Sequence, residues 1–379
     1  MKPNEVVIVG GGVIGLSIAY VLAREGVLAT VLDRGGLGRA ASWAGAGMIP
    51  PHTERLKTNP TVELRSWSAM LYPEWSAALL DETGIDNGFR RTGGVDVALT
   101  PAEEAELLTS AGRWRAERIV YERLAPGDFG RVEPALSPEL RLAYFLPDRA
   151  QIRNPRHLKA LAASLGRRGV DLRPDSAVLG FEARGGRVVA VRTEAGPIPC
   201  GTLIVAAGAW TAGLLGALNV PIATPPLKGQ IVMLNPGRPM IRRIIEHGRN
   251  YLVPRDDHRI LIGATEEDAG FDARTTPEAF ADLREVAYRI CPSLRAAEVE
   301  RTWAGLRPGS VDSKPYLGFA PAFANLIVAA GHKRAGLQLA PATAEVIADL
   351  ALGRRPRVDL HPFRLDREPG EPADPTFRS

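Results

Sequence analysis

The chain has 379 residues, which exceeds what one hydrophobic core normally serves and predicts two domains. Its 47 basic and 43 acidic residues leave a formal net charge of +4, and the arginines are scattered among acids, which argues against a nucleic-acid stripe and a polybasic membrane tail. The two cysteines, Cys200 and Cys291, lie in no CxxC motif and near no histidine cluster, so we expect free thiols in a reducing cytoplasm and no metal site.

The first element is an uncharged stretch, residues 6–23, VVIVGGGVIGLSIAYVLA, which on charge alone resembles a signal peptide or a short membrane span. Three consecutive glycines in its middle argue against both. We interpret it as a buried strand (6–10), a glycine loop and a helix that ends at Gly26, followed by a second strand over 28–33.

The glycine loop has the spacing Gly10-x-Gly12-x-x-Gly15, and Asp33 ends the second strand. Glycines allow close approach of the backbone to a pyrophosphate, and the helix N-terminus binds its charge. An acid at the position of Asp33 accepts hydroxyls of the adenosine ribose. Together these features predict a bound dinucleotide, NAD or FAD.

Two further segments favour FAD. A second run of small residues, 41–51 (ASWAGAGMIPP), can lie against a long flat molecule. Residues 326–332 (LIVAAGH) and the apolar run after them form another strand, glycine loop and helix about three hundred residues downstream. A contiguous nicotinamide-binding domain has no need of that return.

The intervening chain contains helices, a meander and a hairpin. A capping box begins a helix at Thr100, in which Pro101 takes the first helical position and Glu103 reaches back. The other expected elements are a helix from Asn154 to about Arg168, three strands over 178–206 with turns at Gly185–Gly186 and around Gly196, a hairpin over 250–268, and a helix from Thr276–Pro277 to about Cys291.

Arg307 stands in the stretch WAGLRPGS (303–310) and precedes a proline, so we expect it to end a strand with its side chain in a fixed direction. Such a guanidinium typically binds one planar anion. The alternative is a structural arginine that braces the turn.

Several of these motifs occur together and in a characteristic order. The segments GGGVIGLSIAYVLAREG, ASWAGAGMI, LIVAAGAW, WAGLRPGS and GHKRAGLQLAPAT resemble the FAD-dependent D-amino acid oxidase family, and most closely its glycine oxidase branch associated with thiamine biosynthesis. The similarity extends from about residue 5 to about residue 362.

This resemblance implies an α/β fold in which a Rossmann-like FAD-binding domain is interleaved with an α+β substrate domain built on an antiparallel sheet. We expect FAD-binding segments near 1–80, 145–220 and 320–365, and substrate-binding segments near 85–140 and 221–315. The proline-rich, polar tail, 368–379, is expected to be disordered.

The resemblance also implies which side chains meet the ligands. The carboxylate-binding arginine and tyrosine of the family fall on Arg307 and Tyr251, although strand alternation leaves Arg255 on the same face as Tyr251. Arg334 completes the candidate catalytic residues, or alternatively lies at the pyrimidine end of the flavin. The candidate cofactor-binding residues are Gly10, Gly12, Val13, Ile14, Gly15, Asp33, Arg34, Ala41, Ser42, Gly47, Met48, Val178, Ala207, Gly208, Trp210, Gly331, His332, Arg334, Gly336, Leu337 and Gln338.

The activity that the resemblance implies is oxidation of glycine and small amines, such as sarcosine and small D-amino acids. The hydrogen on the α carbon leaves as a hydride to flavin N5 and an imine forms; oxygen then reoxidises the flavin and gives hydrogen peroxide. Such chemistry needs orientation and a grip on the carboxylate more than acid–base groups. A role in thiazole and thiamine biosynthesis is also implied.

Other functions stay open at this point. The nearest is a D-amino acid oxidase or dehydrogenase that takes larger substrates or passes electrons to a quinone. A flavin-dependent nucleic-acid modifier and a non-catalytic flavin protein rank lower. We expect non-covalent FAD, because neither cysteine lies in the C-terminal flavin motif, and no nucleic acid or integral membrane segment. A homo-oligomer is compatible with the sequence.

Overall fold

The computed structural model describes residues 6–53 and 59–368. The tail expected to be disordered, 368–379, lies outside the described residues except for residue 368. Two large sheets dominate the described chain, one of six and one of eight strands. The helices of this part of the chain are Val13–Arg24 (α1), Ala41–Ala44 (α2), Pro60–Thr83 (α3), Pro101–Glu117 (α4), Phe129–Val132 (α5), Asn154–Arg167 (α6), Thr211–Gly216 (α7), Pro277–Ile290 (α8) and Gly336–Ala351 (α9).

The six-stranded sheet contains the predicted glycine-loop unit. Its strands, in spatial order, are Tyr316–Phe319 (β18), Leu326–Ala330 (β19), Thr202–Val205 (β12), Val6–Val9 (β1), Ala29–Leu32 (β2) and Asp171–Arg173 (β8). All neighbours are parallel except β18 and β19. Because β1, β2, β12 and β19 are parallel, their carboxyl ends lie at the same edge of the sheet, which is where ligands of such sheets bind.

Both faces of this sheet are covered, as its apolar strands require. Along β1, Val6 and Ile8 pack in one core with α1, α6 and α9. The alternate residues Val7 and Val9 pack in a second core with Val188 and Val191, which belong to a smaller antiparallel sheet.

That smaller sheet corrects the sequence prediction for residues 178–206. Three strands were expected, whereas the structure has four: Val178–Arg184 (β9), Arg187–Thr193 (β10), Gly196–Pro199 (β11) and β12. The first three form the antiparallel sheet, and the chain then breaks at Cys200 and Gly201 so that β12 can pair in parallel with β1 and β19. Since β11 and β12 pair in different sheets, the chain changes direction between them.

The eight-stranded sheet is antiparallel apart from one parallel pair, β4 with β14. Its strands, in spatial order, are Glu298–Pro308 (β17), Pro226–Asn235 (β13), Ile260–Gly263 (β16), Asn250–Pro254 (β15), Ile244–His247 (β14), Gly94–Ala98 (β4), Leu142–Leu146 (β6) and Glu122–Leu124 (β5). The predicted end of a strand at Arg307 is confirmed, because β17 ends one residue later. Helix α8 packs its apolar face on this sheet.

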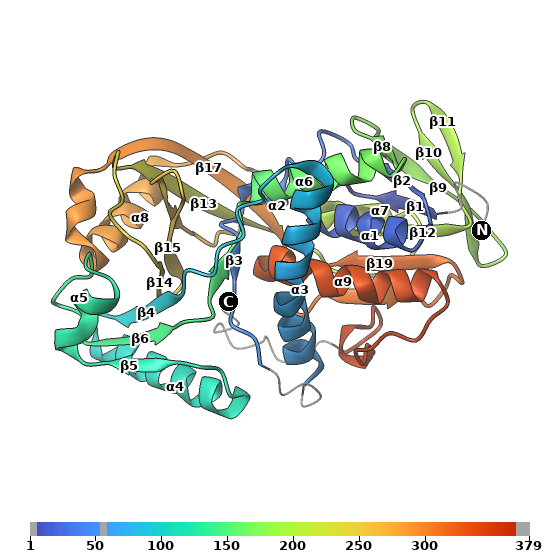
Figure 1. The fold of residues 1–379 in the computed structure, drawn as a ribbon. Coiled ribbons are helices and arrows are strands. Elements are labelled where there is room, and N and C mark those ends of the chain that lie inside the picture. The colour runs from blue at the N-terminus through green and yellow to red at the C-terminus, as the bar shows by residue number, and fades with distance from the viewer. Residues whose placement is uncertain (1–5, 54–58, 369–379) are drawn as a thin grey trace.

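Figure 1 shows the arrangement of the two sheets. The six-stranded sheet with α1 and α9 lies at one end of the molecule, the eight-stranded sheet with α4, α5 and α8 at the other, and α3 stands between them. Between the ends, a short antiparallel pair is formed by Met48–Ile49 (β3) and Ala150–Gln151 (β7). The exact domain boundaries expected from the sequence stay a prediction.

Local helix signals in the sequence were good guides. The capping box is present, since Thr100 accepts from the Glu103 amide and the Glu103 carboxylate accepts from the Thr100 amide. Thr276 caps α8 and its first helical residue is proline. The long helix α3 was not predicted, because Pro73 lies inside it and interrupts the helical pattern.

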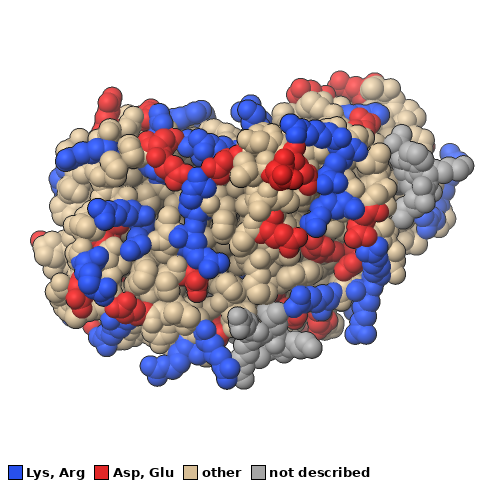
Figure 2. Space-filling view, in the orientation of Figure 1, with Lys and Arg blue, Asp and Glu red and all other residues tan. Residues whose placement is uncertain are grey.

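Charged side chains are mixed over the surface. On the face in Figure 2, basic and acidic residues lie beside one another and not in separate patches. Surface ion pairs account for part of this pattern, as between Arg90 and Asp86 at 2.6 Å. Each such exposed pair contributes little to stability.

His157 gives a stability prediction. Its side chain is fully buried on α6, with its ring 5.8 Å from that of Tyr72 on α3. Burial lowers its pKa to about 4, whereas an unfolded histidine titrates near 6.5. The unfolded chain therefore binds the extra proton first, and the free energy of unfolding should fall by about 3 kcal/mol between pH 7 and pH 4 from this residue alone.

Urea unfolding at several pH values between these limits measures the effect. In His157→Gln, which removes the titrating ring, the decline with acidification should be shallower by that amount. Equal slopes in both proteins would contradict the assignment.

Candidate active site

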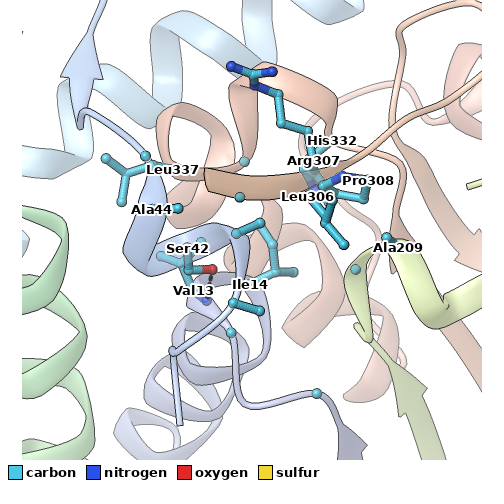
Figure 3. A pocket seen from close by; sticks show the side chains of 18 of the residues that line it. Val13, Ile14, Ser42, Ala44, Ala209, Leu306, Arg307, Pro308, His332 and Leu337 are labelled. Atoms are coloured by element: carbon cyan, nitrogen blue, oxygen red, sulfur yellow. Dashed lines mark hydrogen bonds between the residues drawn. The ribbon is translucent and has the colours of Figure 1, made fainter. Parts of the chain in front are cut away.

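A cavity of about 510 Å³ lies between the two large sheets. It is lined by the glycine loop, α2, the end of β17 and the start of α9. Figure 3 shows Ser42 and Val13 joined by a hydrogen bond on one side, with Leu306, Arg307 and Pro308 on β17 across from them. Every candidate site residue from the sequence lines this cavity except Gly15 and Gly331.

The glycine loop is packed too tightly for side chains. A Cβ on Gly15 would lie 1.9 Å from the Gly10 carbonyl oxygen, and a Cβ on Gly10, whose φ is +111°, would lie 2.3 Å from that of Ala206. The Ser42 hydroxyl accepts from the Val13 amide at 2.9 Å at the N-terminus of α1. These contacts bring bare backbone and a helix N-terminus to the cavity wall, as a pyrophosphate requires.

Asp33 lies where the ribose-binding acid of a dinucleotide fold is expected. Its two carboxylate oxygens accept from the amides of Gly11 (2.7 Å) and Gly35 (2.9 Å), which fixes the side chain at the end of β2. Each oxygen retains capacity for a further hydrogen bond. Beside it, the Arg34 guanidinium carbon lies 3.7 Å from the centre of the Trp210 ring. This end of the cavity fits the adenosine half of FAD.

The loop before α9 closes the other side. His332 is buried, its Nε2 lies 3.2 Å from the Thr343 hydroxyl, and burial lowers its pKa to about 3, so the ring is neutral. Gly331 does not line the cavity but packs beneath the loop, where a Cβ would lie 2.8 Å from the Tyr316 ring. Together with the first strand and helix, this return of the chain fits a long, two-part cofactor.

Arg307 projects into the cavity without an acidic partner in the described part of the chain. Its Nη1 donates to the backbone oxygens of Thr265 (3.0 Å) and, more weakly, Lys228 (3.4 Å). Burial lowers its pKa, and the phenolic group of Tyr251 opposes that effect. A guanidinium held by carbonyls alone retains donors for an incoming carboxylate.

Tyr251 is the second expected carboxylate ligand, and it too lines the cavity. Burial raises the pKa of its phenol, so the group stays a neutral hydrogen-bond donor. Arg255, on the same strand face, is bound elsewhere: it donates to the Ala46 oxygen (2.6 Å) and to the side chain of Gln151 (2.8 Å), and it does not line the cavity. Of the two residues that strand alternation left open, Tyr251 therefore lines the cavity and Arg255 does not.

Two glycines that the sequence did not single out make room for these side chains. A Cβ on Gly229 of β13 would lie 2.2 Å from Arg307 Nη2, and a Cβ on Gly263 of β16 would lie 2.4 Å from the Tyr251 hydroxyl. The guanidinium and the phenol therefore lie flat on neighbouring strands. These positions depend on strand pairing, which a single sequence does not reveal: Gly263 lies directly opposite Tyr251, and Gly229 lies two residues along β13 from Leu227, the residue opposite Arg307.

Gly229→Ala should move the Arg307 guanidinium without unfolding the protein, because the clash involves the end of a flexible side chain. We expect the KM for an amino acid substrate to rise roughly tenfold as the carboxylate grip weakens. Steady-state kinetics check this, with Tm and flavin content as controls. An unchanged KM would show that the guanidinium does not contact substrate.

Arg334 lies in the cavity wall and forms an ion pair. Its Nε donates to Glu266 at 2.9 Å, while Lys333 is 3.9 Å from the same carboxylate. Burial alone would raise the pKa of Glu266, but the two cations, Arg334 foremost, hold it below its usual value. Sequence reasoning missed Glu266, since it lies 68 residues from Arg334.

Glu246 is a further lining residue that the sequence did not indicate. It pairs with Tyr251 across β14 and β15, and its carboxylate lies 3.3 Å from the fully buried Arg149.

Met48 lines the cavity as expected. His247, on which no role was placed, lies 3.0 Å from Glu103 and does not line it.

The described residues contain neither a membrane-spanning helix nor a cluster of metal-ligating side chains. No helix in 6–53 and 59–368 is long and apolar enough to cross a membrane. Over the same residues, no three His, Cys, Asp or Glu side chains gather as a metal site would need.

Comparison with known proteins identifies the family. The DAO family profile, described as FAD dependent oxidoreductase, matches residues 5–350. Glycine oxidase from Pseudomonas putida is 36% identical over 361 residues, 95% of this chain and 98% of that protein. The bifunctional protein ThiO/ThiG of Synechocystis is 33% identical over 96% of this chain, which spans 54% of it. The crystal structure of glycine oxidase from Geobacillus kaustophilus superposes with a TM-score of 0.92 at 32% identity, covering 98% of this chain and 100% of that one.

Proposed function

Since the chain belongs to the DAO family of FAD-dependent oxidoreductases, as an enzyme that oxidises amines or amino acids, we propose that its substrates are glycine and small amines. Sarcosine and small D-amino acids belong to the same class. The similarity to glycine oxidases over nearly the whole chain supports this proposal.

The observation that carries it is the position of Arg307. This guanidinium lines the cavity, has only backbone oxygens as partners in the described chain, and lies close enough to Tyr251 for the phenol to affect its pKa. A bidentate carboxylate satisfies both donors at once. If Arg307 only braced the turn, its remaining N–H donors, which face the cavity, would have no hydrogen-bond acceptor in the described chain.

When bound, FAD would supply a two-electron acceptor for the hydride on the substrate's α carbon, which leaves the imine, and oxygen would take up the electrons as hydrogen peroxide. The chain's own residues orient the substrate. Arg307 and the neutral Tyr251 hold the carboxylate, and Arg334, fixed by Glu266, adds positive charge at the same end. No protein nucleophile is required, because positioning supplies most of the rate enhancement.

The residues proposed to hold FAD are those that line the cavity beside the glycine loop. Ser42 and the α1 N-terminus would receive the pyrophosphate, and Asp33 the ribose. We propose that the flavin is non-covalent, because Cys200 and Cys291 are both buried away from the cavity lining. Acid precipitation should therefore leave the flavin in the supernatant and the protein colourless.

The proposal extends to thiazole formation in thiamine biosynthesis. The similarity to a protein in which a ThiO part is joined to a ThiG part supports it.

Anaerobic mixing tests the substrate directly. The purified protein is combined with glycine, sarcosine, D-alanine and D-proline in turn while the flavin absorbance is followed. Bleaching by glycine supports the proposal. Bleaching by the larger substrates alone favours a D-amino acid oxidase, and no bleaching by any of them contradicts an amino acid oxidase of this class. Reoxidation by air with release of peroxide distinguishes oxygen from a quinone as acceptor.

A further inference from the structure

Phe271 is an exposed aromatic residue with an unusual neighbour. Although 54% exposed, its ring stacks on the Trp210 indole with centroids 5.4 Å apart and planes at 29°. Phe271 follows β16 of the eight-stranded sheet and precedes α8, whereas Trp210 follows β12 of the six-stranded sheet. The stack therefore links the two halves of the molecule outside the cavity, which Phe271 itself does not line.

The segment that carries Phe271 is fixed on both sides. Before it, the amides of Glu267 and Lys228 each donate to the other's carbonyl at 2.9 Å, which attaches the segment to β13. After it, the Thr276 amide donates to the side-chain oxygen of Gln230 on β13 at 2.8 Å. Because both flanks are bonded, the position of the ring is defined although much of it faces solvent.

The Trp210 indole contacts both Phe271 and Arg34, and it lines the cavity. Arg34 lies over it at 3.7 Å from the ring centre, a distance at which a cation is attracted by the aromatic face. Arg34 directly follows Asp33, and Asp33, Arg34 and Trp210 all line the cavity. The three-part stack of Phe271, Trp210 and Arg34 thus ends beside the acid that would bind the ribose.

We propose that Phe271 is a positioning residue for FAD. It holds the Trp210 indole and, through it, the Arg34 guanidinium against the adenosine half of the cofactor, and so slows FAD release. Arg307 and Tyr251 lie on β17 and β15, whereas Phe271 follows β16 and contacts Trp210. Thr265, which accepts from Arg307, lies on the same segment as Phe271, so the kcat at saturating FAD is the readout that distinguishes FAD retention from an effect on the carboxylate grip. Phe271 lies in a surface loop that belongs to none of the sequence motifs described above.

Dilution of the holoenzyme tests the proposal without any substrate. Free flavin fluoresces more strongly than bound flavin, so the signal reports FAD release and its dissociation constant. In Phe271→Ala, the FAD Kd should rise about fivefold, as expected for loss of one aromatic pair. The kcat at saturating FAD should equal that of the unaltered enzyme, and Phe271→Tyr, which keeps the ring, should retain FAD normally.

Phe319→Ala is the matched control. Phe319 is also an exposed phenylalanine (42%) but lies at the far end of β18 and does not line the cavity. An FAD Kd of Phe271→Ala within twofold of the original, an equal rise in Phe319→Ala, or a rise in Phe271→Tyr as large as in the alanine variant would each overturn the proposal. Should Phe271→Ala be recovered without flavin, Phe271→Leu is measured by the same criteria.

Discussion

Replacing Arg307 by alanine should raise the KM for glycine roughly 100-fold while the flavin content stays that of the unaltered enzyme. A carboxylate that loses a desolvated guanidinium partner forfeits on the order of 2–5 kcal/mol. Arg307 has no acidic partner in the described chain, so removing it leaves no buried carboxylate unpaired and the fold should persist. Steady-state kinetics with glycine, together with the flavin absorbance per protein, check both expectations.

Arg307→Lys is the informative companion. Lysine keeps the charge but not the planar fork, so it should recover only part of the lost KM. If Arg307→Ala loses flavin or fails to fold, the arginine braces the end of β17 and does not bind substrate. An equal KM for the alanine variant and the original would place the carboxylate elsewhere in the cavity.

Gly15→Ala should abolish FAD binding. The new Cβ would lie 1.9 Å from the Gly10 carbonyl oxygen and 3.3 Å from Ile8 on β1. The obstacle is backbone, so either the glycine loop or α1 must move, and the pyrophosphate site at the α1 N-terminus moves with it. The measurement is the flavin content of the purified variant, expected to fall below about one tenth of the original, a loss of more than 1.4 kcal/mol in binding.

Gly112→Ala is the control for this substitution. Gly112 also lies in a helix, α4, but a Cβ there meets nothing within 4 Å. Alanine is the better helix former, so this variant should keep its flavin and gain up to about 1 kcal/mol of stability. A Gly15→Ala protein that retains full flavin would show that the loop can relax without cost to the cofactor site.

Local patterns in the sequence were sufficient for the dinucleotide unit. Strand, glycine loop, helix and strand follow one another within residues 6–33, so short-range spacing alone predicts β1, α1 and β2. The same is true of the caps at Thr100 and Thr276. The resemblance to a known family then added residues far apart in the chain, and nearly all of them line one cavity.

What escaped prediction depends on long-range geometry. The acid that fixes Arg334, the glycines beneath Arg307 and Tyr251, and the stack on Trp210 all arise from pairings between distant strands and loops. No periodicity marks such partners. The break between β11 and β12 was missed for a related reason, since it depends on which sheet each segment joins.

Strand β17 serves both halves of the cavity. Gly305 lies so close to α2 that a Cβ there would come within 2.5 Å of the Ala44 Cβ, and the Trp303 indole donates to the Ala44 oxygen at 2.9 Å. Arg307 is two residues further along the same strand, about 7 Å away. The strand therefore fixes the separation between α2, which lines the proposed FAD site, and Arg307, the proposed carboxylate ligand. The lining residues Gly248 and Arg249 lie on another segment, between β14 and β15, so substitutions there leave that separation unchanged.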